Sequence, residues 1–363
     1  MKKISLILSL VLLLSLFAGC AGTPVIYYTD CTCPVGSHDV QPTQPAPAVP
    51  QEPVGEGAVK TGLYIGAGIG DSKNAAADAA GEAAYDVTVA AVNVDAQGVI
   101  TACTIDSIKA GVSFDATGAI TSDVAAEVKT KNELGADYGM VAWGGAIAEW
   151  DAQAAALAAF AVGKTVQELR EGAVDESGYA PEGSDLSTSA TIKLSGYVDA
   201  IEAAAANAKD LGAQAGDKLV LSVIPGLSDS KAASAEGAGT AQLNVDAAAV
   251  TFNAQGVITS CYIDSLQAKV NFDTTGAITT DLTAPVKTKN QLGADYGMVA
   301  WGGAVAEWDA QAASFAAYVT GKTPADVAGI ALNEKTAPAD ADLATSVTIS
   351  VIPFQKLIAK AAQ

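Results

Sequence analysis

The chain has 363 residues, of which 50% are hydrophobic and only 6% aromatic, and its formal net charge is −20. This length predicts about two domains, with cores built mainly from Ala, Val, Ile and Leu. The negative charge argues against a nucleic-acid partner, because neutralising phosphates requires a basic face. It suits the solvated surface of an exported protein.

The first segment has the layout of an export signal. Lys2 and Lys3 precede an apolar run over residues 4–17, which is short for a membrane span, and small residues then lead to Cys20. The pattern resembles a bacterial lipoprotein signal. That resemblance implies removal of residues 1–19 and lipidation of Cys20, which would anchor the chain on the extracytoplasmic face of the cell membrane. An ordinary secretory signal or an N-terminal helix are the alternatives.

Residues 20–58 form a second distinct segment. Repeated Pro with Gly and Gln predicts a semi-rigid, largely disordered stalk. The stalk contains Cys31, Cys33 and His38, the one histidine of the chain. A zinc site would need a different Cys spacing and a fourth ligand, so we expect no metal here. Outside the cell, a strained local disulfide or pairing with another chain is the expected state of the two thiols.

The rest of the chain consists of two similar repeats. Residues 59–208 and 217–363 align at an offset of 158, which becomes 157 late in the repeat, and residues 209–216 join them as a short linker. A period of this length is too long for a solenoid unit. We therefore expect two tandem homologous domains.

One block is almost unchanged between the two copies. Residues 128–155 and 286–313 differ at only two pairs of positions, Glu133/Gln291 and Ile147/Val305. A shared binding role would explain this identity, and so would a folding demand or gene conversion.

Taken in chain order, the first part of each repeat predicts an antiparallel meander. In the first copy, residues 72–83 suit a loop or an Ala-rich helix. Alternating β-branched residues then predict strands over 84–94, 99–108 and 112–114, separated by turns of Asp and Gly chemistry.

The second predicted strand of each copy contains a cysteine. Cys103 and Cys261 alternate in phase with Ile105 and Ile263. This phase predicts small, buried, apolar side chains. A disulfide between the two copies is the alternative.

The second part of each repeat predicts helices. Residues 146–162 are strong helix formers. A core-facing stripe is expected at three- and four-residue spacing, formed by Ile147, Trp150, Ala154, Leu157, Ala158 and Ala161. A short helix over 166–170, a strand over 188–194 and a closing helix over 197–208 follow. The predicted fold class is α+β, an antiparallel meander with helices packed on one face in each domain.

No catalytic constellation is present in the sequence. Neither repeat contains His, so Ser–His and Cys–His arrangements are excluded, and phosphate-loop and His-Glu-x-x-His motifs do not occur. We therefore expect a protein that is not an enzyme.

The repeated block is the best candidate binding surface. Its aromatic residues beside Gly could form a stacking wall for a small planar ligand, and its lysines could meet an anionic group such as a phosphate. The candidate ligand-binding residues are Lys129, Lys131, Tyr138 and Trp143 in the first copy and Lys287, Lys289, Tyr296 and Trp301 in the second. The alternative is structural, with the aromatics in the core and the lysines solvated.

A motif order over residues 87–150 and 245–308 carries a family resemblance. Phe-Asp-x-x-Gly-x-Ile is followed by Lys-Thr-Lys-x-x-Leu-Gly and by Tyr-Gly-Met in both copies. The order resembles secreted lipoproteins of Gram-positive anaerobes that are grouped with FMN-binding-domain proteins. The resemblance implies two FMN-binding-like domains, which would bind a flavin or similar ligand or serve as an electron-transfer accessory.

The covalent flavin motif of that family, Ser/Thr-Gly-Ala-Thr, is not matched. Ile120 and Ile278 stand at the acceptor position, so the resemblance implies non-covalent FMN binding. The other expected function is a cell-surface structural or interaction module that binds a wall component or an envelope protein.

Overall fold

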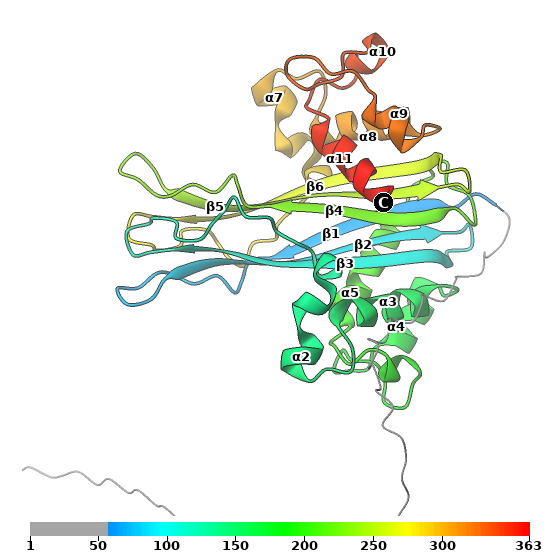
Figure 1. Cartoon of the computed structure of the whole chain (residues 1–363), viewed down its shortest axis with the longest axis horizontal. Coiled ribbons are helices and arrows are strands. Elements are labelled where there is room, and N and C mark those ends of the chain that lie inside the picture. The colour runs from blue at the N-terminus through cyan, green and yellow to red at the C-terminus, as the bar shows by residue number, and fades with distance from the viewer. Residues whose placement is uncertain (1–56) are drawn as a thin grey trace, which may run out of the picture. The chain divides into compact units, whose positions relative to one another are not determined.

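The structure, a computed structural model, describes residues 57–363, which belong to one compact unit (Figure 1). None of the helices in this range has the length and apolar character needed to span a bilayer. The predictions that lie outside the described residues concern the signal over 1–19, the stalk as far as residue 56, Cys20, Cys31, Cys33 and His38.

Each repeat begins with a three-stranded antiparallel sheet whose strands follow chain order. The strands are β1 (Lys60–Gly68), β2 (Gly81–Val94) and β3 (Ile100–Phe114), then β4 (Lys218–Gly226), β5 (Gly239–Phe252) and β6 (Ile258–Phe272). The turn between β2 and β3 is closed by Asp95, whose Oδ1 accepts hydrogen bonds from the backbone N–H groups of Gln97 and Val99 at 2.9 Å. This Asx turn explains why the hairpin forms here.

The two sheets pack face to face, and helices cover their outer faces, so the fold has four layers (Figure 1). Successive side chains of a strand point to opposite faces. In β2, Val87, Val89 and Ala91 enter an inner core that both sheets share, while Ala90 and Val92 face the helices. Because both faces are buried, the end of β2 lacks polar alternation. The two repeats therefore share a core as well as having one each.

Matched contacts relate the two copies across this inner core. The rings of Phe114 and Phe272 stack with centroids 4.0 Å apart and planes 2° apart. Ala75 N–H donates to Gly276 O at 2.9 Å, and its counterpart Ala233 N–H donates to Gly118 O at 2.8 Å. The reciprocity indicates an approximate two-fold relation between the copies.

The helices of the two copies correspond closely. In the first copy they are α1 (Lys131–Leu134), the 3₁₀ helix η1 (Gly135–Tyr138), α2 (Met140–Gly144), α3 (Trp150–Ala161), α4 (Val166–Ala173), η2 (Leu186–Thr188) and α5 (Ser195–Ala206). In the second they are α6 (Lys289–Leu292), η3 (Gly293–Tyr296), α7 (Met298–Gly302), α8 (Trp308–Val319), α9 (Pro324–Ala328), α10 (Ala341–Ala344) and α11 (Ile352–Ala361).

The α+β class and the meander are confirmed, but some predicted strands are wrong. The runs over 99–108 and 112–114 are one strand, β3, and β1 and β4 were not predicted. Of the two alternatives for the segment before β2, the loop is confirmed and the helix is wrong: residues 73–80 form a loop with isolated bridges between Lys73 and Glu82 and between Ala76 and Ala79. Residues 188–194 are not a strand, because the Gln153 side chain accepts from the N–H groups of Thr191 and Ile192 and ties this segment to α3.

The core stripe of the long helix is confirmed except at its start. Trp150, Ala154, Leu157, Ala158 and Ala161 are buried on α3, but Ile147 is 56% exposed. The helix begins at Trp150 rather than at residue 146. The physical reason is that Glu149, just before α3, caps the separate helix α2 instead of continuing a longer one.

Cys103 and Cys261 lie in separate outer cores and are free thiols. The alternative of a disulfide between the two copies is therefore wrong. Cys261 is buried as predicted, whereas Cys103 is only partly covered. Burial raises the pKa of each thiol to about 12.

Candidate functional site

The Lys-Thr-Lys turn of the first copy folds inward. Thr130 and Glu133 form a capping box on α1, with Glu133 accepting from Thr130 N–H at 2.8 Å. This cap places Lys131, which is 6% exposed, with its Nζ 5.1 Å from the ring centroids of both Tyr138 and Trp150. The two aromatic faces attract the ammonium group. Lys131 therefore stabilises the block from within.

The second copy repeats this arrangement. The Nζ of Lys289 lies 5.2 Å from the Tyr296 ring and 4.7 Å from the Trp308 ring. Burial lowers the pKa of Lys289, while the carboxylates of Asp246 and Asp264 act in the opposite direction. The ammonium group is thus already surrounded by rings and by two acidic side chains.

Trp143 lies on the outside of the block. The Glu149 carboxylate accepts hydrogen bonds from the N–H groups of Met140 and Val141 at 2.8 and 3.0 Å and so caps α2. Gly139, at φ 79°, precedes α2, and a Cβ added there would lie only 2.4 Å from Cδ1 of Trp143. The indole therefore rests across a glycine, which holds it in place although it is 91% exposed.

Exposed apolar residues lie close to each of these indoles in the sequence. We name each group of residues a Trp head; the first consists of Val141, Trp143 and Ile147, and the second of Val299, Trp301 and Val305. In the second head Glu307 caps α7 with the same distances, 2.8 and 3.0 Å, and Trp301 is also 91% exposed. Figure 1 shows α2 and α7 on opposite sides of the paired sheets. The two similar heads thus lie on opposite sides of the paired sheets.

The predicted ligand-binding residues divide into two groups. Lys131 and Tyr138 come together, as do their counterparts Lys289 and Tyr296, but in an enclosed packing arrangement. The indoles of Trp143 and Trp301 are almost fully exposed, and Lys129 and Lys287 are exposed as well. The block therefore fits a flavin poorly, because its inner lysine is closed to a phosphate and its tryptophan is not part of an enclosed wall.

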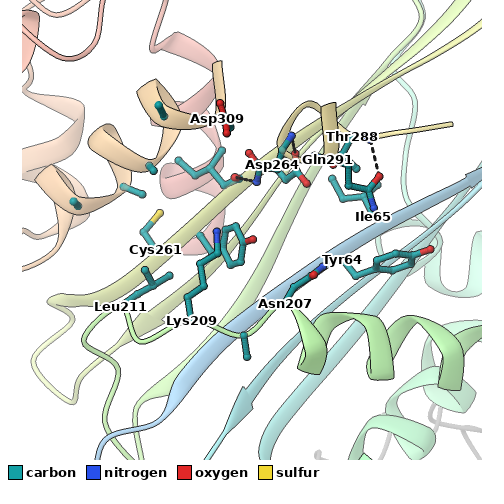
Figure 2. Close-up of a pocket in the computed structure, with 18 of the residues that line it drawn as sticks. Tyr64, Ile65, Asn207, Lys209, Leu211, Cys261, Asp264, Thr288, Gln291 and Asp309 are labelled. Atoms are coloured by element: carbon teal, nitrogen blue, oxygen red, sulfur yellow. Dashed lines mark hydrogen bonds between the residues drawn. The ribbon is translucent and has the colours of Figure 1, made fainter. Parts of the chain in front are cut away.

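A cavity that the sequence does not suggest lies where the two repeats meet (Figure 2). Its volume is about 920 Å³. The walls come from β1, the segment that follows α5, β6 and an alanine face of α8. Its chemically distinctive lining residues are Tyr64, Lys209, Tyr262, Asp264, Gln291 and Asp309. Lys209 places its Nζ 4.5 Å from the Tyr262 ring centroid.

Asp264 is the most buried carboxylate of this cavity, at 7% exposure. Its Oδ1 accepts from the N–H groups of Ser265 at 2.7 Å and Asn290 at 3.1 Å. Burial raises the pKa of Asp264 to about 6, against the opposing effect of hydrogen bonds from Thr288 and these two backbone groups. Asp264 therefore carries a negative charge at neutral pH at some cost to folding.

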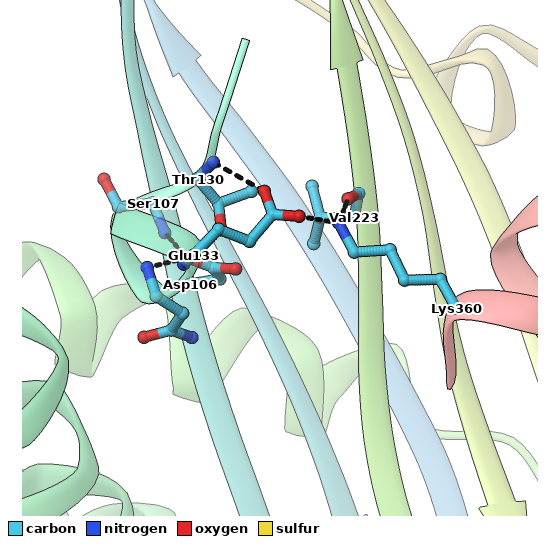
Figure 3. A network of polar contacts seen from close by, with 7 residues as sticks. Asp106, Ser107, Thr130, Glu133, Val223 and Lys360 are labelled. Atoms are coloured by element: carbon cyan, nitrogen blue, oxygen red, sulfur yellow. Dashed lines mark hydrogen bonds and ion pairs between the residues drawn. The ribbon is translucent and has the colours of Figure 1, made fainter. Parts of the chain in front are cut away.

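The corresponding place in the first copy is occupied by a lysine from α11 (Figure 3). The Nζ of Lys360 lies 2.7 Å from Oε1 of Glu133 and also donates to the carbonyl oxygen of Val223. At the two-fold related place, Gln291 of the second repeat corresponds to Glu133, and Ala203 on α5 of the first repeat corresponds to Lys360 at the offset of 157. One of the two differences within the repeated block thus coincides with an ion pair in one copy and a cavity in the other.

Comparison of the chain with protein-family models, with curated proteins and with solved structures finds no match. Within residues 57–363, no cluster of three or more His, Cys, Asp or Glu side chains could hold a metal ion. The geometry of the Trp heads and of the cavity therefore carries the functional argument.

Proposed function

We propose that this protein is a non-catalytic, lipid-anchored binding module of the bacterial cell surface that contacts an envelope protein through its two Trp heads. One observation carries the proposal: both copies hold an indole at 91% exposure by the same glycine and glutamate devices. A tryptophan that stays exposed at equivalent positions of both copies, with exposed apolar residues next to it in the sequence, suits a surface that a partner covers. Tryptophan is also among the residues that contribute most to protein interfaces.

The chemistry around each indole favours a protein over a wall glycan. The residues of the first head that lie near Trp143 in the sequence are Val141 and Ile147, both apolar and exposed. Recognition of a sugar would combine a stacking ring with several polar side chains that satisfy its hydroxyl groups. An apolar groove on a protein matches this head better.

The opposite placement of the heads supports contact with two partner molecules, or with two sites on a large assembly. Because the two heads are part of one chain, simultaneous binding of both raises the overall affinity above that of a single head. The near identity of the two blocks follows naturally, because both heads would recognise the same surface. The prediction of a lipid anchor at Cys20 belongs to this proposal, since it would hold the module at the membrane.

The test is a binding comparison of the wild type with Trp143→Ala, Trp301→Ala and the double variant. Each protein is immobilised and exposed to detergent-solubilised envelope proteins and, separately, to purified cell-wall material. Losing a central Trp from an interface costs about 2 kcal/mol or more, which is roughly 30-fold in affinity. We expect each single variant to bind the partner with reduced affinity. The double variant should show no detectable binding.

The matched control is Tyr179→Ala, which removes an exposed aromatic side chain outside the heads. It should bind like the wild type. Full retention of the partner by the double variant would refute the proposal. Loss of binding to wall material alone would replace the protein partner with a wall component.

The motif order shared with FMN-binding-domain proteins supports a second proposal, non-covalent binding of a flavin or a role as an electron-transfer accessory. Because the block fits a flavin poorly, this second proposal expects the site elsewhere in the repeats. Purified protein loaded with FMN should then show flavin absorbance at an unmodified protein mass. Colourless protein that gives no heat on titration with FMN or riboflavin would end this proposal.

A further inference from the structure

The approximate two-fold relation between the copies provides an internal template for the cavity. In the first copy, an ammonium group sits between the carboxylate of Glu133 and the carbonyl oxygen of Val223. In the second copy, the matching positions are Gln291 and Ile65, and both line the cavity. The chain therefore supplies its own ammonium at one place and leaves the related place open.

We propose that the cavity between the repeats binds an organic primary amine, whose ammonium group takes the place that Lys360 occupies in the first copy. This site is independent of the Trp heads. It lies between β1, β6 and α8, whereas the heads lie on α2 and α7 and on the turns that follow these helices.

The charge of the lining supports a cation. The charged side chains that line the cavity are three carboxylates, Asp210, Asp264 and Asp309, and one ammonium, Lys209, and the ammonium group of Lys289 lies next to Asp264. With Lys289 counted, their sum is −1 when all are ionised. A ligand with a phosphate or carboxylate would meet this negative charge, whereas an ammonium would reduce it. The ammonium of Lys209 is directed over the Tyr262 ring, 4.5 Å from its centroid.

The rest of the lining suits the organic body of such an amine. Ala313, Ala316 and Ala317 on α8 offer a smooth apolar wall, and Tyr64 and Tyr262 add two rings. A volume of about 920 Å³ lies within the usual range for sites that hold small molecules. The ligand class is therefore a monoamine with an aromatic or aliphatic body, either as a free molecule or as a lysine side chain of a partner.

The experiment is calorimetric titration of the full chain with tyramine, with its uncharged analogue 4-ethylphenol and with lysine blocked at both backbone ends. We expect one amine per chain, bound at least ~10-fold more tightly than 4-ethylphenol, because a charge-assisted hydrogen bond is lost without the ammonium group. Tighter binding of tyramine would indicate a free amine as the natural ligand. Tighter binding of blocked lysine would indicate a protein side chain.

Two variants locate the binding. Ala313→Leu fills the cavity and should weaken amine binding at least ~10-fold, whereas Ala155→Leu, the same change at the related position of α3, should leave it unchanged. The combined variant Ala203→Lys with Gln291→Glu copies the arrangement of the first repeat and should abolish binding by supplying an internal ammonium. Circular dichroism checks that each variant is folded.

Three results would overturn the proposal. They are equal affinity for tyramine and 4-ethylphenol, no saturable binding of either amine, and undiminished binding by the variant that carries the internal ammonium. Because none of these measurements involves the Trp heads, they leave the proposed interaction function untouched.

Discussion

Asp264 should make the protein less stable as pH rises through the weakly acidic range. Its pKa is 3.8 in an unfolded chain and about 6 in the fold, since burial disfavours the charged form. The native state therefore binds more protons than the unfolded state between these values. The contribution of Asp264 to the free energy of unfolding is fully present below pH 3.8 and is lost as pH rises through about 6. The difference of roughly two pH units corresponds to about 3 kcal/mol.

The perturbation is Asp264→Asn, which keeps the Oδ1 acceptor for the N–H groups of Ser265 and Asn290 but has no charge to bury. We expect the variant and the wild type to be about equally stable below pH 3.8, and the variant to be about 3 kcal/mol more stable at neutral pH. Urea unfolding of both proteins at a series of pH values measures this difference. Taking the difference cancels the contributions of carboxylates that are remote from Asp264 and Lys289.

A second site tests the sign of the reasoning. Asp106 holds the related position in the first copy, and burial raises its pKa as well, so Asp106→Asn should shift stability in the same direction. A stability difference between Asp264→Asn and the wild type that is the same at acid and neutral pH would refute the argument.

Three further predictions concern the block and the thiols. Gly139→Ala should displace the indole of Trp143 and lower the free energy of unfolding by about 1–2 kcal/mol, because φ at residue 139 is 79°. The NMR signal of the indole N–H reports the movement. In the control Gly144→Ala, the added Cβ meets nothing within 4 Å, so the indole should stay in place. Glu133→Gln should cost only about 0.5 kcal/mol in thermal or urea unfolding, because both partners of its ion pair are about one-third exposed; a loss of several kcal/mol would mean that the pair acts as a buried one. With the pKa of each raised to about 12, Cys103 and Cys261 should react with a thiol reagent mainly upon unfolding. Peptide mass mapping separates them from Cys20, Cys31 and Cys33, and rapid labelling of Cys103 or Cys261 in the native protein would contradict this.

The missed strand β1 shows why local sequence signals failed in places. Its sequence, KTGLYIGAG, contains three glycines, which are depleted in strands. Gly62 is required because a Cβ there would lie 2.0 Å from the carbonyl oxygen of Ala204 on α5. Gly62 thus lowers the strand propensity of β1, and the same residue allows α5 to pack against that strand. Such a requirement appears only once the helix is in place.

The repeated block was informative about its helix and uninformative about its turns. Periodicity identified the buried stripe from Trp150 to Ala161, because a helix with one apolar face has to bury it. The preceding turns have no period, so nothing local decides which side chain faces inward. The structure sends Lys131 between two rings and Trp143 into solvent, the reverse of what charge and hydrophobicity alone suggest.

The sequence by itself determined the duplication, the meander, the helical second half and the lack of histidine in either repeat, because each of these depends on composition or on short-range pattern. Only the tertiary structure decided that the two sheets share an inner core, that the Trp heads lie on opposite sides of the paired sheets, and that Lys360 fills one of two related places. These features depend on contacts between residues far apart in the chain, such as Glu133 with Lys360. The difference between Glu133 and Gln291 was visible from the start, but its meaning depended on the residue opposite it.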